Sequence, residues 1–190
     1  MCCIFALAVA APWPAGAIDV QPTPAQIRAA LDRGKAAAEQ RSPPDTFYVR
    51  FGAGDELHPS GFLITKLGAL SVMATHMAFR GLEPADMDVA QVLDAPTMLV
   101  SAVIFGNQPA FAVDSYMVLD QGGKVIKPVT VRFDGQANRS AAWPENPRFK
   151  AKVVASFNYA DFNPVAATTI TVFPANGGEV SFQLDFSQVH

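Results

Sequence analysis

From Thr97 to the end of the chain, apolar residues recur at every second position in one segment after another. Alternation of this kind is the pattern of a β-strand with one buried face. In the segment Val180–Ser187, Val, Phe, Leu and Phe alternate with Ser, Gln, Asp and Ser. Turn residues separate these segments at short intervals, which is typical of antiparallel sandwiches. The sequence therefore predicts an antiparallel β-sandwich, and we expect an immunoglobulin-like topology.

The expected strands can be placed from this pattern. They span residues 97–105, 110–119, 124–133, 148–159, 168–173 and 179–186. The first of them, TMLVSAVIF, is apolar at both alternating sets of positions, which predicts a strand that is covered on both faces. The turn Asp120-Gln121-Gly122-Gly123 predicts a hairpin between the second and third strands, because paired glycines tolerate tight turns.

A second constraint lies between Leu67 and Phe79, where almost every residue is apolar or small. A helix that is apolar on all sides is buried in protein or in lipid, and a bilayer span needs about 20 apolar residues. The uninterrupted run is shorter than that. We therefore expect a buried helix that begins at Thr65, ends at Gly81 and packs against the strand at 97–105.

The segment before this helix predicts a second helix and one strand. Thr23-Pro24-Ala25-Gln26 has the composition of a capping box with proline at the first helical position, so a helix should run to about Gln40. Phe47, Val49 and Phe51 alternate with Thr46, Tyr48 and Arg50, which predicts a strand over residues 46–51. Pro84 with Asp86 predicts a short third helix. The expected class is α+β: one domain at 18–190, with a helical part containing one strand at 18–95 and the sandwich at 96–190.

Residues 1–17 resemble a secretory signal sequence. An apolar core precedes Ala15-Gly16-Ala17, a small-residue cleavage site, although no Lys or Arg stands before the core. Cleavage there would give a secreted or periplasmic chain that begins near Ile18. Such a chain would lack Cys2 and Cys3, the only cysteines, and with them any disulfide or thiolate site. The competing interpretation is that these residues form an N-terminal strand or helix of the mature fold.

Composition narrows the class of partner. Charged residues make up 16% of the chain, compared with about 25% in average soluble domains. The net charge is −3 and the sequence has no basic run, so nucleic-acid binding is disfavoured, because neutralising phosphates requires clustered Lys and Arg. A surface poor in charge favours association with a partner or with another copy.

The loop at residues 52–61 gathers Asp55, Glu56, His58 and Ser60. An imidazole and carboxylates are the groups that acid-base or metal chemistry uses. Their spacing matches no defined metal motif, so no metal or cofactor is expected. The competing interpretation is an ordinary solvated loop.

A second candidate site is the long connection at residues 134–147. It contains Trp143 beside Pro144, and its polar residues are Asn138, Arg139, Glu145 and Asn146. Long loops often bind partners, and an aromatic anchor among polar groups is a common recognition arrangement. Alternatively, Trp143 plugs the end of the sandwich.

Other patterns are weaker. Asn158, Asp161 and Asn163 offer oxygen ligands for calcium, but calcium needs six to eight ligands, and an Asx-rich turn is the favoured interpretation. His76 is expected in the core or on a helix face. His190 is the last residue of a loose tail.

A basic row, Arg148, Lys150 and Lys152, should lie on one face of a strand. It could bind an acidic partner, or it could simply be solvated and discourage aggregation at a sheet edge. Asn138-Arg139-Ser140 fits the glycosylation acceptor pattern, which matters only in a pathway that modifies it.

Three functional hypotheses follow. The first is an exported, non-catalytic module that binds an unknown protein or glycan of the cell envelope through sandwich loops or an uncovered sheet face, and that could form homo-oligomers. The second is a small secreted hydrolase with its site near the loop at 52–61. The third is an envelope protein that an uncleaved N-terminal segment retains at the membrane.

Overall fold

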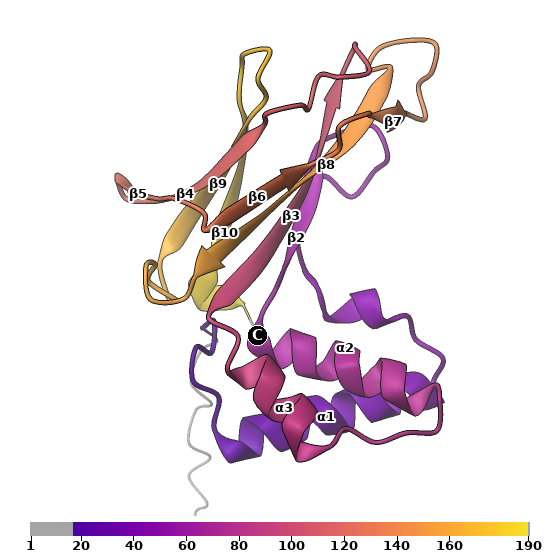
Figure 1. Ribbon diagram of the computed structural model, residues 1–190, viewed down its shortest axis with the longest axis vertical. Helices are drawn as coiled ribbons and strands as arrows, with labels where there is room; N and C mark the ends of the chain where they lie inside the picture. The colour runs from indigo at the N-terminus through magenta and orange to yellow at the C-terminus, as the bar shows by residue number, and fades with distance from the viewer. Residues whose placement is uncertain (1–16, 190) are drawn as a thin grey trace, which may run out of the picture.

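The computed structural model describes residues 17–189. In this part of the chain, strands form two antiparallel sheets that face each other, and three α-helices lie beyond one end of the sheets (Figure 1). The predicted α+β class and the two packed antiparallel sheets are confirmed. The predicted signal sequence lies outside the described residues, except for its last residue.

The larger sheet has six strands in the order β1-β2-β3-β8-β6, with β7 also paired to β8. These strands are β1 (Val49–Gly52), β2 (Ser60–Ile64), β3 (Thr97–Gly106), β6 (Thr130–Phe133), β7 (Asn138–Arg139) and β8 (Phe149–Asn158). The smaller sheet has the order β10-β9-β4-β5. Its strands are β4 (Tyr116–Gln121), β5 (Lys124–Ile126), β9 (Ala167–Phe173) and β10 (Val180–Asp185). This strand order does not by itself establish the immunoglobulin-like topology.

The main hydrophobic core fills the space between the sheets. Its central side chains come from alternate positions of four strands: Met98, Val100, Ala102 and Ile104 of β3, Ala151, Val153, Ala155 and Phe157 of β8, Met117 and Leu119 of β4, and Ile170 and Val172 of β9. Burying one large apolar side chain contributes about 1.5–3 kcal/mol. Ile18 joins this core: it is 1% exposed, and its N–H donates to the Pro164 carbonyl at 3.1 Å. Within the described residues, the chain is therefore part of the core from Ile18 onward.

The predicted hairpin is confirmed between β4 and β5. Gly122 and Gly123 have φ angles of 64° and 92°, a conformation that glycine adopts without steric cost. Asp120 Oδ1 accepts from the Gly123 N–H at 2.8 Å. After β5 the chain crosses to the other sheet, so the single strand expected at 124–133 is two strands in different sheets. Pro128 lies in the crossing, where it removes a backbone donor.

The helices are α1 (Pro24–Glu39), α2 (Lys66–Ala78) and α3 (Asp86–Leu93). Their predicted starts are confirmed: Thr23 and Gln26 form a capping box, and Thr65 Oγ1 accepts from the Gly68 N–H at 3.0 Å. In the first turn of α3, Asp88 Oδ2 accepts from the Ala85 N–H at 2.9 Å.

Helix α2 differs from the prediction, because it is buried on one face only and packs against α1 instead of the sheet. Its buried residues are Leu67, Gly68, Leu70, Ser71, Ala74 and Thr75, whereas His76 is exposed and Phe79, just after the helix, is 50% exposed. Small residues allow the close approach: a Cβ on Gly34 of α1 would lie 2.3 Å from the Ser71 carbonyl oxygen. Ser71 Oγ donates to the Ala30 carbonyl at 2.8 Å, and Thr75 Oγ1 donates to the Gly34 carbonyl at 2.9 Å. The helices thus form a second, separate core.

Residues 18–95 contain two strands, although one was predicted. The strand β2 was missed because Gly61 suggests a break; in the structure its missing side chain makes room for Phe51, whose ring would lie 2.4 Å from a Cβ there. The other strand begins later than expected, because Pro44–Phe47 forms a 3₁₀ helix. Likewise, β4 begins at Tyr116, after a run of turns from residue 109.

A polar junction joins the helices to the larger sheet. Lys66 Nζ donates to the Leu93 carbonyl and lies 5.1 Å from the centre of the Tyr159 ring. The Tyr159 N–H donates to the Pro96 carbonyl at 3.0 Å. Burial raises the pKa of Tyr159 to about 12, so this phenol stays neutral at physiological pH.

Candidate functional site

The outward faces of the two sheets have different chemistry. On the smaller sheet, the register aligns short polar side chains across β9 and β10. Thr169 Oγ1 donates to Gln183 Oε1 at 3.1 Å, and the hydroxyls of Thr171 and Ser181 lie 3.0 Å apart. These two pairs, which we call the polar patch of β9 and β10, satisfy the hydrogen-bonding groups of their side chains. The same face also carries the exposed apolar side chains Tyr116, Val125 and Phe173.

The larger sheet presents an apolar outward face. We call it the outer apolar face and define it by six half-buried side chains: Phe62, Ile64, Leu99, Val103, Phe105 and Val154. At its β1 edge, the ring of Tyr48 stacks on that of Phe62 with centroids 4.5 Å apart. No helix of the described chain packs on this face (Figure 1). The sequence predicted that a helix would cover it, so its exposure corrects that expectation.

Basic residues border the outer apolar face. In one row across the sheet, Phe62, Ser101 and Val154 lie between Arg50 of β1 and Arg132 of β6. The predicted basic row also lies here: Lys152 is level with Val103, and Lys150 is level with Phe105. Arg148 precedes β8 and is exposed. Arg50 pairs with Asp45. The face is thus an apolar surface with a predominantly cationic border.

The predicted loop around Trp143 forms a compact cluster at the far end of the larger sheet. The indole meets the ring of Phe149 edge-on, with centroids 5.3 Å apart, and Arg139 Cζ lies 4.6 Å from its centre. Trp143 is nevertheless 41% exposed. It therefore rests on the sandwich with one side and faces solvent with the other.

The rest of this loop divides into a fixed base and an exposed tip. Ser140 is buried; its Oγ accepts from the Ala142 N–H at 3.1 Å and donates to the Pro147 carbonyl. The predicted polar neighbours are all exposed: Asn138, Arg139, Glu145 and Asn146. The structure therefore brings Arg139 against Trp143 and leaves the others around the tip.

In the loop at 52–61, His58 Nδ1 lies 2.8 Å from the Asp55 carboxylate. Asp55 Oδ1 also accepts from the N–H groups of Leu57 and His58, each at 2.9 Å. The hydrogen bond from the Leu57 N–H has the larger effect in lowering the pKa of Asp55, and the hydrogen bond from the His58 side chain lowers it further. The side chains of His58 and Asp55 are 68% and 55% exposed, and Glu56 is exposed as well. All these contacts come from one turn, and Ser60, the fourth predicted residue, begins β2.

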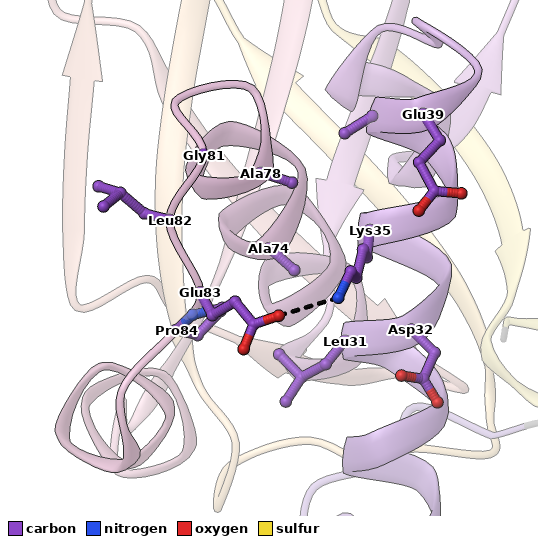
Figure 2. A pocket seen from close by; sticks show the side chains of 11 residues that line it. Leu31, Asp32, Lys35, Glu39, Ala74, Ala78, Gly81, Leu82, Glu83 and Pro84 are labelled. Atoms are coloured by element: carbon purple, nitrogen blue, oxygen red, sulfur yellow. Dashed lines mark hydrogen bonds and ion pairs between the residues drawn. The ribbon is translucent and has the colours of Figure 1, made fainter.

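A groove opens between α1, the end of α2 and the connection to α3, with a volume of about 510 Å³ (Figure 2). We call it the helical groove. Its apolar lining consists of Leu31, Ala38, Ala74, Ala78, Gly81, Leu82 and Pro84, and its charged lining consists of Asp32, Lys35, Glu39 and Glu83. Lys35 Nζ reaches across to Glu83 at 2.8 Å. Sequence patterns did not predict this groove, because it depends on how closely α1 and α2 pack.

The weaker candidates have local roles. Asn158 Oδ1 accepts from the Ala160 N–H at 3.2 Å, and Asn163 Oδ1 accepts from the Val165 N–H at 3.1 Å, which are Asx turns. Asp161 is exposed between them. Among residues 17–189, no three His, Cys, Asp or Glu side chains are grouped as a metal ion would require. In the same part of the chain, no helix has the length and hydropathy of a membrane span. His190 lies outside the described residues.

Comparison with known proteins does not place the chain in a family. Neither a family model nor a curated protein matches it. Among solved structures, it is similar to the archaellum periplasmic stator protein FlaG from Sulfolobus acidocaldarius, with 12% identity and a TM-score of 0.33 over 48% of this chain and 88% of that chain. It is also similar to a chain of the FlaF and FlaG stator complex from the same organism, with 13% identity and a TM-score of 0.29 over 47% of this chain and 78% of that chain. These likenesses are too remote to identify a function.

Proposed function

We propose that this protein is an exported, non-catalytic interaction module of the cell envelope that binds another protein through the outer apolar face. The observation that carries the proposal is the contrast between the two sheets. On the smaller sheet, hydrogen-bonded polar side chains occupy β9 and β10 beside the exposed apolar residues Tyr116, Val125 and Phe173. On the larger sheet, six apolar side chains span β2, β3 and β8 within a basic border. Contiguous apolar surfaces of this kind are rare on monomers and mark interaction sites.

The shape and charge of the face define its partner. A pleated, open sheet face suits a protein surface better than a small molecule, because small ligands bind in concave pockets. Arg132, Lys150 and Lys152 favour a partner whose apolar contact surface is edged with carboxylates, since complementary charges guide orientation and association rate. Arg50 contributes less, because Asp45 already pairs with it.

The proposal that the protein is exported depends on the signal-like sequence of residues 1–17. Ile18 is 1% exposed in the core, so cleavage beyond it would remove a core side chain, and cleavage just before it would leave the fold intact. We therefore expect the exported chain to begin near Ile18. Intact-mass measurement tests this expectation, and a mass that still includes Cys2 and Cys3 would favour the membrane-retained alternative.

The hydrolase alternative has one supporting contact, the 2.8 Å pair of His58 and Asp55. Both side chains are largely exposed, and their partners belong to the same turn. This arrangement therefore favours a role for the pair in stabilising the turn over a role as a catalytic dyad.

Site-specific photo-crosslinking in the native envelope tests the proposed face. A photoreactive residue at position 103 should yield a crosslink to a discrete partner protein, because Val103 lies within the outer apolar face. The matched control is position 183 in β10, whose side chain belongs to the polar patch of β9 and β10 on the other sheet. Equal crosslinking from both positions, or none from position 103, would contradict the proposal.

A further inference from the structure

A second pair of features lies outside the outer apolar face: an exposed aromatic anchor and a groove with the opposite charge. We infer that copies of this protein associate head to tail, with the Trp143 tip of one copy seated in the helical groove of the next. This inference goes beyond the proposed function and does not depend on it.

The helical groove can accept one large aromatic side chain. Its volume of about 510 Å³ falls within the range of about 300–1,000 Å³ for protein ligand pockets. Its apolar surface includes Leu31 and Ala74 on the two helices and Pro84 on the connection, whereas the Leu82 side chain points away from α1 (Figure 2). An indole ring could bury its faces there.

The charges around the groove are mainly negative. Three carboxylates, from Asp32, Glu39 and Glu83, line it together with a single ammonium group, Lys35. Lys35 is already paired with Glu83 at 2.8 Å, and this hydrogen bond lowers the pKa of Glu83. Asp32 and Glu39 remain to attract a cationic side chain.

The Trp143 tip supplies the matching groups. Trp143 is 41% exposed, and Arg139 lies over its ring at 4.6 Å. Arg148 is exposed at the base of the same loop. Its backbone N–H donates to Asn107 Oδ1 at 3.3 Å. Trp and Arg are the residues that most often dominate binding at protein interfaces. The tip therefore offers an apolar anchor with two cations, Arg139 and Arg148, and one carboxylate, Glu145. Its net charge is opposite to that of the groove.

The position of these features determines the kind of assembly. The helices lie at one end of the long axis of the molecule, and β7, which begins the Trp143 tip, lies toward the other end (Figure 1). A copy therefore cannot fill its own groove. Because the two contacting surfaces differ, the interface is heterologous, so copies can add in succession to form a ring or a filament.

Sedimentation equilibrium on the purified mature chain provides the first test. We expect concentration-dependent association that weakens at high salt, because the paired charges are exposed. Trp143→Ala should weaken it at least tenfold, an effect typical of an interface anchor. Tyr116→Ala is the matched control, since Tyr116 is also exposed, at 40%, but lies on the smaller sheet. A monomeric wild type at all concentrations would overturn the inference, as would equal loss of association in both variants.

Mixing provides a second test that does not depend on the stability of one variant. Ala78→Phe should fill the helical groove and keep the Trp143 tip, whereas Trp143→Ala keeps the groove. Each variant alone should be monomeric. An equimolar mixture should form a dimer that cannot extend, because the Ala78→Phe copy has only a usable tip and the Trp143→Ala copy has only a usable groove. A mixture that stays monomeric while both variants are folded would overturn the head-to-tail contact. Neither substitution touches the outer apolar face, so crosslinking at position 103 reports independently on the proposed function.

Discussion

At the scale of single residues, two contacts carry consequences that sequence patterns did not reveal. Gly34 lies at a close contact between α1 and α2, and its absent side chain leaves room for the Ser71 carbonyl. Asp55 holds its turn by accepting hydrogen bonds from two backbone N–H groups and from the His58 ring. One contact fixes the distance between two helices, and the other fixes the conformation of an exposed loop.

Replacing Gly34 with alanine should lower the free energy of unfolding by about 1–3 kcal/mol, because an added methyl group would overpack the contact between the helices. Urea denaturation measures this change. Gly54→Ala is the matched control, since a Cβ there meets no atom within 4 Å. Identical stability of Gly34→Ala and the wild type would show that the helices are not closely packed.

Replacing His58 with alanine should raise the pKa of Asp55 but leave it below its ordinary value, because the Leu57 N–H still donates to the carboxylate. Carboxyl-carbon NMR titration measures this pKa in both proteins. Because the folded-state pKa is lowered, the stabilisation from Asp55 is present above the unfolded-state pKa of about 3.9. It disappears as the pH falls through the lower, folded-state pKa. An ordinary pKa for Asp55 in the wild type would contradict the turn described here.

At the scale of elements, local patterns predicted much of the structure, and long-range pairing accounts for the rest. The alternation predicted β8, β9 and β10, glycines predicted the hairpin, and capping residues predicted α1 and α2. The strand β2 was missed, since Gly61 serves packing and does not break the strand.

The candidate sites follow the same division. The sequence indicated Trp143 as a candidate, because an aromatic residue in a long loop is a local signal, but it left open whether the indole binds a partner or plugs the end of the sandwich. The outer apolar face was predicted to be covered, since two apolar sets of positions in β3 do not reveal what lies against them. Its basic border depends on the register that brings Arg132 and Lys152 of distant strands beside it. No spacing within a single segment carries that information.

Helix α2 permits a direct test of the second core. Leu70 of α2 is fully buried in the core that the helices share. Leu70→Asp should therefore destabilise the protein by several kcal/mol, the cost of an unpaired buried charge. Thermal denaturation followed by circular dichroism measures this loss. His76→Asp is the matched control, because His76 lies exposed on the same helix. A midpoint equal to that of the wild type would exclude a buried α2.

At the scale of the whole molecule, the fold separates three surfaces. The outer apolar face covers one side of the larger sheet, and the polar patch of β9 and β10 lies on the outward side of the smaller sheet. The helices, with their groove, lie at one end of the sheets (Figure 1). A chain with a net charge of −3 nevertheless places a basic border around its apolar surface. The outer apolar face and the helical groove therefore lie on different parts of the molecule.

Quantitative capture of partner protein from the native envelope tests the proposed binding face most directly. Val154 belongs to the outer apolar face and lies beside Arg132 of its basic border. Val154→Glu should therefore reduce capture at least tenfold while changing the thermal midpoint little, because the side chain points away from the core. Gln183→Glu, in the polar patch of β9 and β10, should capture as much partner as the wild type. Equal capture by Val154→Glu and the wild type, with both proteins folded, would contradict the proposal that this face binds the partner.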